Sequence, residues 1–376
     1  MSRINLCLGD WIFWPGKNSY NFRGALSAWD DYFLNFIIAN KVTDIILVGE
    51  QRKYHNSAIK IAQQHRVKVN VTDFGYTRPD WITLERDGMN GTSHMPRNID
   101  KIKKINENLD DADLKKIYSD SETKMIIGDM FYSFSTMFDL FFFPRYTRSD
   151  MRQSPAKDLF YSLIRWSKLL VNYQKTKAFT KLVESGNFIF YLFTMQLEHD
   201  FQIVAYSKYT DLEEPLRKVI KSFSENSKKD INLVIKNHPC DSGLKNWCKI
   251  VYRLAEEYGI REKVFFVDGG TSVDTFINHA SGVVCVNSTC GLRSLILGCP
   301  VKTLSHAIYG IEGLTFQGEL DEFWSNPQTV NKDNVKSFIN VVVNKLQIRG
   351  VFFNEPGCSH GIKEFADRLC SGNVGI

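Results

Sequence analysis

One polar segment in the second half of the chain carries side chains that suit an anionic ligand. The apolar run Leu233–Ile235 ends in Lys236, Asn237, His238 and Pro239. Lys236 and His238 are two residues apart on an expected strand, so their side chains share a face. Open α/β sheets bind ligands beyond the carboxyl ends of their strands, where a cation and an imidazole can hold a phosphate. A histidine at such a turn is also common as a purely structural residue.

A second segment places hydroxyl groups between an apolar run and an expected helix. The sequence VNSTCGLRS, residues 286–294, contains Asn287, Ser288, Thr289 and Gly291. The free amides and dipole of a helix start can hold a phosphate, and the hydroxyls can donate to its oxygens. The glycine would let the backbone approach a ligand closely. A simple N-cap by Ser288 or Thr289 is an equally good interpretation.

A third segment clusters acid and base groups at the point where two domains would meet. Glu198, His199 and Asp200 stand together in the sequence MQLEHDFQI. A carboxylate in a cleft can act as a general base or as a nucleophile toward an anomeric carbon. The alternative is a polar loop that precedes a helix beginning near Asp211.

The first half has three stretches that mix charged and aromatic side chains. They lie at residues 8–24, 49–55 and 73–93, and each follows an expected strand. Aromatic faces beside charged groups suit a sugar or a lipid headgroup, although such aromatics also serve as packing. We predict that this rim binds such a ligand through Asp10, Arg23, Arg52, His55, Arg78 and Glu85.

The hydrophobic pattern predicts an α/β fold. In the first third, strands at 4–9, 43–50 and 67–75 alternate with helices at 25–41 and 56–66. This order predicts a parallel sheet covered by helices. A mainly helical section follows. The alternation restarts with strands at 187–196, 231–237, 263–269, 282–288 and 300–305, separated by helices at 212–224, 244–258, 271–279 and 290–297.

The restart near Gly186 predicts two Rossmann-like domains facing a cleft, the GT-B-like architecture of many glycosyltransferases. The expected N-terminal domain spans residues 1–186 and binds the acceptor, with a helical insertion. The expected C-terminal domain spans residues 187–376 and binds the donor, and its final segment may return to pack on the first domain. Many proteins share such halves, so fold alone does not decide function.

Composition narrows the class of protein. The chain has 376 residues, 43% of them hydrophobic and 24% charged, with a net charge of +5. This mild basic excess is too small for a nucleic-acid partner, but it suits an anionic small molecule or membrane surface. The eight cysteines form no CxxC pair, which favours a reducing compartment. No signal peptide or zinc motif is apparent, so we expect a cytoplasmic protein that needs no metal.

Taken in order, these segments resemble the capsule polysaccharide synthesis family and its KpsS-type β-Kdo transferases. The pieces that carry the resemblance run from residue 9 to residue 324. They are GDWIFWPG, GEQRKYH, GYTRPDWITLE, MNGTSHMPR, MQLEHDFQI, KNHPCDSG, VNSTCGLRSLILGCPVK and AIYGIEGLTFQGELDEFW. The chain departs from the family pattern at GEQR and DFGY, both in the half expected to bind the acceptor.

The resemblance implies a glycosyltransferase that uses CMP-Kdo and retains the β configuration. Its acceptor would be a lyso-phosphatidylglycerol at the inner face of the cytoplasmic membrane, where it starts the Kdo linker of a capsule. The protein would be peripheral there and would work beside other capsule synthesis and export proteins. No cofactor is implied, because a helix start, hydroxyls and a histidine can stabilise a departing phosphate without a metal.

The resemblance also assigns roles to residues. Asp200 matches the nucleophile, while Glu198, His199 and His238 are open candidates for acid and base. His238 and Pro239 match the His-Pro motif, and Ser288 and Thr289 match the pair that contacts the CMP phosphate. The sugar carboxylate needs a cation, which Lys236 or Arg293 could supply. The MNGTS piece adds Asn90 to the acceptor-binding set.

Three alternatives remain open at this stage. The donor could be another CMP- or CDP-linked compound, such as sialic acid or a polyol phosphate. The protein could also be a non-catalytic scaffold for capsule assembly. The basic and aromatic section 157–181 could lie against anionic lipid, or it could be an ordinary solvated helix face.

Overall fold

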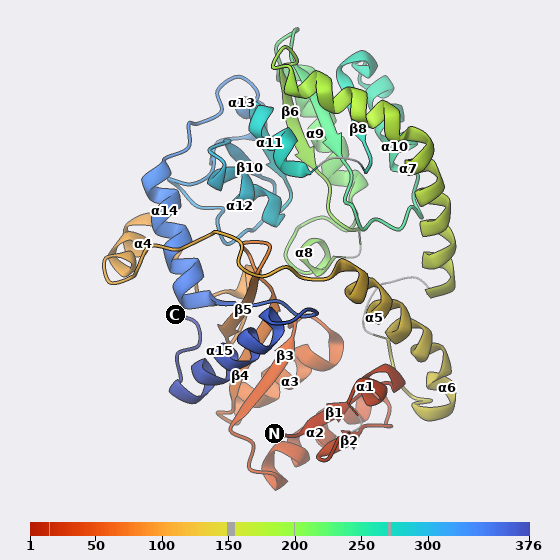
Figure 1. The fold of residues 1–376 in the computed structure, drawn as a ribbon, viewed down its shortest axis with the longest axis vertical. Coiled ribbons are helices and arrows are strands. Elements are labelled where there is room, and N and C mark those ends of the chain that lie inside the picture. The colour runs from red at the N-terminus through yellow and green to blue at the C-terminus, as the bar shows by residue number, and fades with distance from the viewer. Residues whose placement is uncertain (15, 149–154, 199, 270–271) are drawn as a thin grey trace. The chain divides into compact units, whose positions relative to one another are not determined.

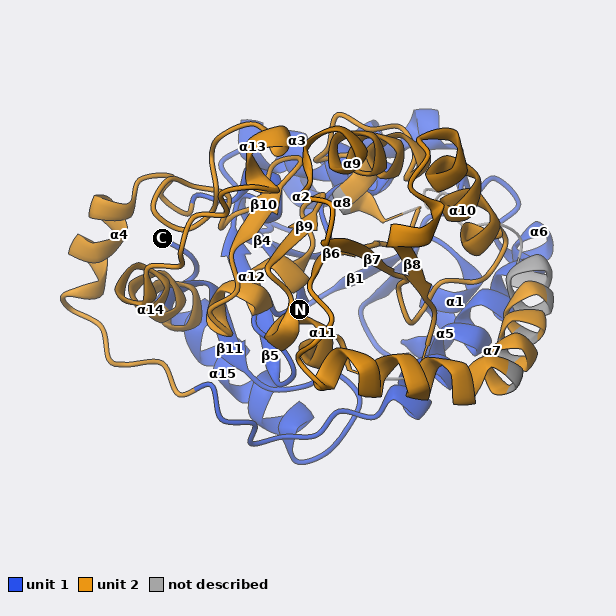
Figure 2. Cartoon of the chain, turned by 90° about the horizontal axis from the view of Figure 1, so that it is seen from above, with its two compact units in different colours: residues 1–94, 114–155, 345–376 blue, residues 95–113, 156–344 orange. Residues whose placement is uncertain are grey.

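The computed structural model describes the whole chain except residues 15, 149–154, 199 and 270–271. The chain forms two compact units (Figure 2). Unit 1 contains Met1–His94, Leu114–Pro155 and Lys345–Ile376, and unit 2 contains Met95–Asp113 and Ala156–Asn344. This division differs from a single boundary at residue 186. The long helix before that point is part of unit 2, and the C-terminal segment is part of unit 1.

Unit 2 is built around a parallel sheet of five strands (Figure 1). Its order is β10 (Val301–Thr303), β9 (Gly282–Cys285), β6 (Phe190–Thr194), β7 (Asn232–Lys236) and β8 (Val264–Val267). All five predicted strands are confirmed. The three central strands β6, β7 and β9 are short runs that are buried over most of their length, as expected when helices cover both faces of a parallel sheet.

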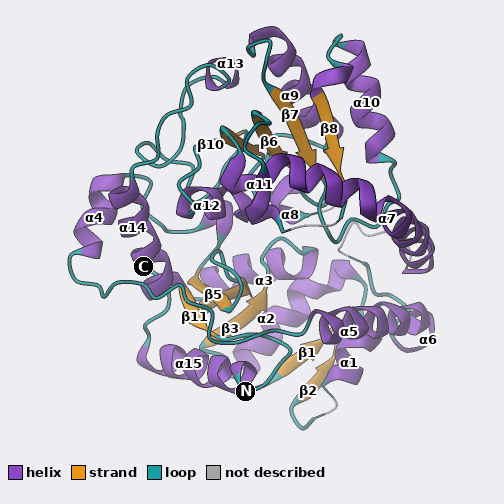
Figure 3. Cartoon of the chain, turned by 45° about the horizontal axis from the view of Figure 1, so that its top comes forward, coloured by secondary structure: helices purple, strands orange, loops and turns teal. Residues whose placement is uncertain are grey.

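Helices cover the two faces of this sheet (Figure 3). On one face, α9 (Glu213–Asn226) and α10 (Trp247–Glu257) pack against strand residues such as Phe193. On the other, α11 (Val273–His279), α12 (Thr289–Ile296) and α7 (Pro155–Glu184) cover the sheet. Phe179 of α7 stacks on Phe265 of β8 with ring centroids 5.3 Å apart. Further helices of the unit are α4 (Ile99–Asn106), α8 (Phe201–Val204), α13 (Leu320–Phe323) and α14 (Lys332–Val341), followed by the π-helical η5 (Val342–Leu346).

Unit 1 contains a mixed four-stranded sheet. Its order is β11 (Gln347–Arg349), β5 (Trp81–Arg86), β4 (Lys68–Phe74) and β3 (Asp44–Val48). The β3–β4 pair is parallel as predicted, but β4–β5 and β5–β11 are antiparallel. The all-parallel prediction is therefore wrong here. The segment WITLE, interpreted as part of a loop, forms β5 because its aromatic, β-branched and apolar residues bury well in a pleated sheet.

The start of the chain forms a separate small element of unit 1. Strands β1 (Arg3–Asn5) and β2 (Ser19–Asn21) pair in parallel with each other and not with the main sheet. The strand predicted over 4–9 ends early, because α1 (Leu8–Phe13) begins there. Unit 1 also contains α2 (Trp29–Ala39), α3 (Lys53–Gln64), α5 (Glu122–Ser135), η3 (Thr136–Phe138), α6 (Asp139–Phe142) and α15 (Gly357–Ser371).

Candidate functional site

Three neighbouring strands of unit 2 end at the segments predicted to bind the donor. The central strand β6 lies between β9 and β7. Thr194 at the end of β6 is in register with Lys236 of β7 and Cys285 of β9. The carboxyl ends of the three strands are therefore level, and the segments that follow them start side by side. This edge of the sheet is where parallel α/β sheets place their ligands.

Two side chains join the segments after β6 and β9. The Gln196 side-chain amide donates to Oδ1 of Asn287 at 2.9 Å, and the Asn287 backbone N–H donates to Oε1 of Gln196 at 3.1 Å. Both residues are buried. Asn287, predicted to contact the donor, thus fixes the chain just before α12. No sequence pattern pointed to its partner Gln196.

The start of α12 is a capped helix terminus. The Ser288 hydroxyl accepts a hydrogen bond from the Cys290 N–H at 3.2 Å, so the N-cap interpretation holds. The Gly291 N–H donates to the Ser288 carbonyl at 2.9 Å. Thr289 is exposed beside them. A phosphate at this helix start would therefore use the Thr289 hydroxyl or displace the Ser288 cap.

The structure explains the glycine at position 291 by packing, whereas the sequence suggested the close approach of a ligand to the backbone. A Cβ placed on it would overlap the Tyr309 hydroxyl and lie 2.8 Å from Cζ of that ring. The buried Tyr309 hydroxyl in turn donates to the Ser288 carbonyl. The glycine thus makes room for Tyr309, whose hydroxyl is hydrogen-bonded to the backbone at the start of α12.

Lys236 is a buried cation at the edge of the sheet. Only 7% of the residue is exposed, and its Nζ donates to the Gly269 carbonyl at 3.3 Å. Burial lowers the pKa of this ammonium, while the carboxylate of Asp268 acts in the opposite direction. Thr194, in register beside it, has a buried hydroxyl with no hydrogen-bond partner among the described residues. A partly desolvated cation next to an unsatisfied hydroxyl favours an anion.

The loop after β7 is held by Arg165 of α7. Nη2 of Arg165 donates to the His238 carbonyl at 3.1 Å, and Nη1 donates to the carbonyls of Pro239, at 2.8 Å, and Asp241. Nε and Nη2 also bind the carboxylate of Asp268 at 3.2 and 2.6 Å. These contacts use all five N–H groups of the guanidinium. Arg165 is buried, so the interpretation of section 157–181 as a lipid-facing surface does not extend to this residue.

The local hydrogen bonds of His238 define its tautomer. Its Nδ1 accepts from the Cys240 backbone N–H at 3.1 Å. A nitrogen that accepts carries no proton, so the neutral ring has its proton on Nε2. The ring is partly exposed at the end of β7. Nε2–H is therefore a donor that can be offered to a phosphate oxygen.

The predicted catalytic carboxylates follow β6. Glu198 forms an ion pair with Lys245, which lies in the loop after β7. Asp200 is half-buried at the start of α8, where its carbonyl accepts from the Ile203 N–H at 2.9 Å. His199 lies outside the described residues. The segment that carries Asp200 thus leaves the sheet between the strands that carry His238 and Ser288.

Arg293, one of two cations proposed for the sugar carboxylate, already has a carboxylate partner. Its Nε and Nη2 bind Oδ1 and Oδ2 of Asp274 at 3.0 and 2.6 Å. This bidentate pair joins α12 to α11 and raises the pKa of the guanidinium. A ligand carboxylate would have to compete with Asp274 for Arg293, whereas Lys236 has no carboxylate within an ion-pair distance among the described residues.

In unit 1, a first group of predicted acceptor residues lies near the ends of β3 and β4. Nδ1 of His55 is 2.8 Å from the Gly49 carbonyl, and burial, aided by Arg52, lowers the pKa of His55 to about 4. Asp10 acts on His55 in the opposite direction. Arg52 and Arg78 both lower the pKa of Asp73, which burial raises overall. This group combines a neutral imidazole with two guanidinium groups.

A second group holds the loop 89–93. Glu85, of which 1% is exposed, accepts from the hydroxyls of Tyr76 and Ser93. The Asn90 backbone N–H donates to the Tyr76 hydroxyl at 2.7 Å. Glu50 accepts from the Thr92 hydroxyl. The buried Glu85 therefore helps to position Asn90 through the Tyr76 hydroxyl, which contacts both residues.

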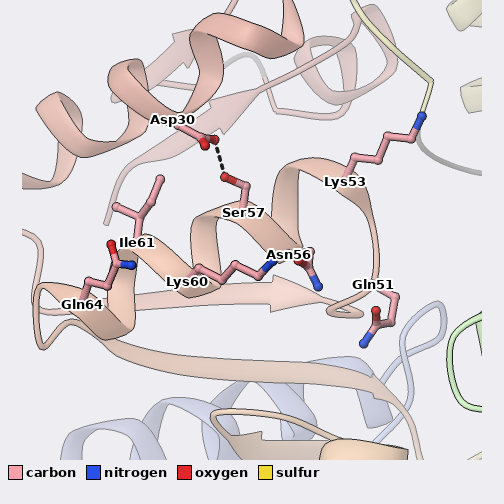
Figure 4. A pocket seen from close by; sticks show the side chains of 8 residues that line it. All are labelled: Asp30, Gln51, Lys53, Asn56, Ser57, Lys60, Ile61 and Gln64. Atoms are coloured by element: carbon pink, nitrogen blue, oxygen red, sulfur yellow. Dashed lines mark hydrogen bonds between the residues drawn. The ribbon is translucent and has the colours of Figure 1, made fainter.

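Two arginines of the predicted acceptor set lie over aromatic rings. Arg78 lies over Phe74 at 4.7 Å from the ring centroid, and Arg23 lies over Phe143 at 5.7 Å. A surface pocket of unit 1 is lined by other side chains of α2 and α3 (Figure 4). Asp30 accepts from the Ser57 hydroxyl there, and Lys53 and Lys60 are among the lining residues. None of the predicted acceptor residues lines this pocket.

Two general features complete the description. The described residues include no group of three or more His, Cys, Asp or Glu side chains arranged to hold a metal ion. Among the described helices, none combines the length and the apolar character needed to cross a membrane.

Fold and site together define an α/β protein with an anion-suited edge on a parallel sheet. The family model of the capsule polysaccharide biosynthesis proteins matches residues 43–353. The chain belongs to this family, which confirms the resemblance seen in the sequence.

Two relatives are similar over most of their lengths. The chain is 29% identical to the capsule polysaccharide export protein KpsS of Escherichia coli over 316 residues, 82% of this chain and 79% of KpsS. It is 28% identical to the capsule polysaccharide modification protein LipB of Neisseria meningitidis serogroup A over 363 residues, 94% of this chain and 85% of LipB.

A solved structure is more distantly similar. The β-Kdo 2,7 transferase of Thermosulfurimonas dismutans KpsC aligns with a TM-score of 0.42 and 15% identity, covering 96% of this chain and 95% of that one. A TM-score this low does not establish a common fold.

Proposed function

We propose that the protein is a retaining β-Kdo transferase that uses CMP-Kdo to start the Kdo linker of a capsule on a lyso-phosphatidylglycerol. The observation that carries this proposal is the set of three level strand ends in unit 2. They bring the segments of Asp200, His238 and Ser288 to one edge of a parallel sheet. Membership of the capsule polysaccharide biosynthesis family supports the pathway.

The donor phosphate lies, in this proposal, at the edge formed by the ends of β7 and β9. The Nε2–H of His238 and the hydroxyl of Thr289 donate to its oxygens, and Lys236 supplies positive charge. Departure of CMP concentrates charge on one phosphate, and fixed donors in a partly desolvated site stabilise it as it forms. The Kdo carboxylate pairs with Lys236 or, if Asp274 is displaced, with Arg293.

Transfer proceeds by two displacements. The Asp200 carboxylate attacks the anomeric carbon, the bond from that carbon to the phosphate oxygen breaks, and CMP leaves with the electron pair. The acceptor hydroxyl then attacks the same carbon, loses its proton to a base and releases Asp200. Two inversions retain the configuration. Glu198, His199 and His238 are the candidates for acid and base.

The acceptor binds unit 1 in this proposal. The guanidinium groups of Arg52 and Arg78 suit the phosphate of a lyso-phosphatidylglycerol. His55, neutral because burial lowers its pKa to about 4, can accept a hydrogen bond from a hydroxyl of the acceptor. Such an acceptor places the protein at the inner face of the cytoplasmic membrane, beside other capsule synthesis and export proteins. The chemistry uses no metal.

Intact-protein mass spectrometry after incubation with CMP-Kdo tests the mechanism. We expect an adduct of one Kdo on the wild-type chain and none on the Asp200→Ala variant. Asp230→Ala is the matched control, because it removes an exposed carboxylate just before β7, at the other end of that strand. It should form the adduct as the wild type does.

Adding a lyso-phosphatidylglycerol then tests the acceptor. The adduct should disappear as one Kdo appears on the lipid. An Asp200→Ala variant with full transferase activity would overturn the double displacement. CMP release from CMP-sialic acid but not from CMP-Kdo would point to another donor, and the absence of any donor turnover would favour a non-catalytic scaffold.

A further inference from the structure

Unit 1 carries a continuous exposed apolar surface on α1, α5, η3 and α6. We call it the apolar face and define it by Phe13, Phe131, Phe134, Phe138, Leu140 and Phe141. Between 43% and 75% of each of these residues is exposed. The elements are in direct contact, since α1 packs on α5 and on η3 (Figure 3). Phe13 meets Phe131 edge-on at 6.0 Å, which joins the two helices at the surface.

The polarity of these helices is reversed relative to a helix that faces water. Ser135 and Asp139 are buried, with 4% and 8% exposed, whereas Leu140 and Phe141 are 73% and 75% exposed. Asp139 accepts the Leu8 N–H at 2.7 Å, and Tyr132 donates to Asp10 at 3.2 Å on the inner side. These polar groups satisfy one another inside while the phenylalanines point outward, and the exposed Asp129 is an acidic exception on α5. Helices in water show the opposite pattern.

The packing of α1 on α5 enforces this orientation. A Cβ on Gly9 would lie 2.6 Å from Cδ2 of the Tyr132 ring, so only glycine lets the two helices approach this closely. The Cys7 thiol is 3.1 Å from the Tyr132 hydroxyl, and burial raises the pKa of Cys7 to about 12. The polar interior is thus closely packed and fixed, and the outward direction of the aromatic residues follows from it.

The charge around the α6 end of the apolar face is positive. Residues 11–18 and 136–148 contain one acidic residue, Asp139, which is buried and hydrogen-bonded. Lys17 and Arg145 are exposed on the same two segments. Protruding apolar side chains flanked by cations are the features that bind an anionic membrane surface.

We propose that the apolar face docks unit 1 on an anionic lipid bilayer, inserting Leu140 and Phe141 below the headgroups while Lys17 and Arg145 contact lipid phosphates. Side chains that are about three-quarters exposed protrude freely, which suits insertion between lipids better than a flat protein interface. The proposal deepens the proposed function, which places the protein at a membrane, by naming the surface that holds it there.

Flotation of the full chain with vesicles tests the proposal. Vesicles of phosphatidylcholine containing about one-third phosphatidylglycerol should carry the wild type, and pure phosphatidylcholine vesicles should carry much less. The Leu140→Ser/Phe141→Ser variant should partition at least about tenfold more weakly, since two large apolar side chains no longer enter the bilayer. Replacing Lys17 and Arg145 with glutamine should weaken binding to the anionic vesicles about tenfold or more.

Ile362→Ser is the matched control, because Ile362 is a 64% exposed apolar residue of α15 in the same unit. It should float like the wild type. Phe134→Ser provides a second variant of the apolar face should the double variant unfold. Wild type that does not float, or face variants that float unchanged, would overturn the proposal. So would a dimer that the face variants dissociate without any vesicle binding.

The readout separates this inference from the transfer chemistry. The Leu140→Ser/Phe141→Ser variant should release CMP from CMP-Kdo at the wild-type rate, since donor chemistry is assigned to unit 2. Loss of flotation with intact CMP release supports the docking surface alone. Flotation of a protein that turns over no donor would leave docking supported and the transferase proposal refuted.

Discussion

Arg165 of α7 and Asp268 after β8 form a buried bidentate ion pair, with Nε 3.2 Å from Oδ2 and Nη2 2.6 Å from Oδ1. The same guanidinium donates to three carbonyls of the His-Pro loop. Arg165→Ala would remove all five of these hydrogen bonds, and Asp268 would keep only the Asn237 side-chain amide, at 3.2 Å, as a donor among the described residues. We expect a loss of about 3 kcal/mol in the free energy of unfolding, measured by urea denaturation.

Arg165 is also expected to position the His-Pro loop for donor binding, in addition to stabilising the fold. Arg165→Lys keeps the charge but cannot donate to five acceptors. It should therefore raise the KM for the donor clearly while lowering the urea midpoint of unfolding only slightly. Arg253→Ala is the matched control, because Arg253 forms an exposed pair with Glu213 and should cost less than about 1 kcal/mol. An Arg165→Lys variant with wild-type KM would refute the positioning role.

A second prediction concerns the contact between Gly291 and Tyr309. Gly291→Ala should destabilise the protein by about 1–3 kcal/mol, because the added methyl group overlaps the Tyr309 ring. Tyr309→Phe should cost about 1 kcal/mol by removing one of the two donors to the Ser288 carbonyl, the other being the Gly291 N–H. The two losses should be less than additive in the double variant, since the phenylalanine lacks the atom that clashes most.

Additive losses in a double-mutant cycle of urea unfolding would show that the methyl group and the hydroxyl do not meet. Gly298→Ala, at a glycine with a positive φ of 81° and open space around it, is a useful comparison. It should be destabilising through backbone strain alone and should add fully to Tyr309→Phe.

The sequence predicts unit 2 well because its strands are short apolar runs between clear helices. Parallel strands buried on both faces show this pattern, and all five were found. The convergence of the segments after β6, β7 and β9 also followed from the pattern, since neighbouring parallel strands share an edge. In unit 1, β5 lies inside the stretch 73–93, which was interpreted as part of a ligand-binding rim, so the antiparallel pairing was not predicted.

The contacts that shape the site were harder to predict. Arg165 lies 73 residues before His238, and nothing in its helix distinguishes it from the exposed lysines around it. Gln196 reaches Asn287 across 91 residues. Gly291 could be singled out in the sequence, but its packing against Tyr309 could not be predicted, because only the fold brings Tyr309 next to α12. Residue types can be read locally, whereas their partners depend on tertiary packing.

A third prediction follows from the His238 tautomer. The Cys240 N–H binds Nδ1, so long-range proton–nitrogen NMR correlations of the neutral ring should show the proton on Nε2. His238→Gln places an amide donor near the position of Nε2 and should keep more of the CMP release activity than His238→Asn. His238→Ala should lower kcat about 10²–10³-fold if the ring acts on the departing phosphate.

A proton on Nδ1 would contradict the structural assignment. Equal activity of the glutamine and asparagine variants would show that the position of the donor does not matter. His279→Ala is a suitable control, since His279 lies at the end of α11 and its Nδ1 binds the Thr275 carbonyl at 2.8 Å within that helix. Its kcat should remain that of the wild type.

The last prediction concerns the pH dependence of stability in unit 1. Burial lowers the pKa of His55 from 6.5 to about 4 in the folded protein. Above about pH 6.5 the ring is neutral in both states and contributes no pH dependence. Between the two values the unfolded chain binds a proton that the folded chain does not, so stability falls as the pH falls. The slope is at most about 1.4 kcal/mol per pH unit.

The His55→Asn variant isolates this contribution. Asparagine can still donate to the Gly49 carbonyl, which lies 2.8 Å from Nδ1, but it cannot titrate. From about pH 7 to about pH 5, urea unfolding should show a loss of stability about 2 kcal/mol larger in the wild type than in the variant. His65→Asn, at an exposed position just after α3, should leave that difference between the two pH values unchanged. If the wild type and His55→Asn lose stability in parallel, His55 takes up its proton in the folded state, and it could not be the neutral hydrogen-bond acceptor proposed for the acceptor site.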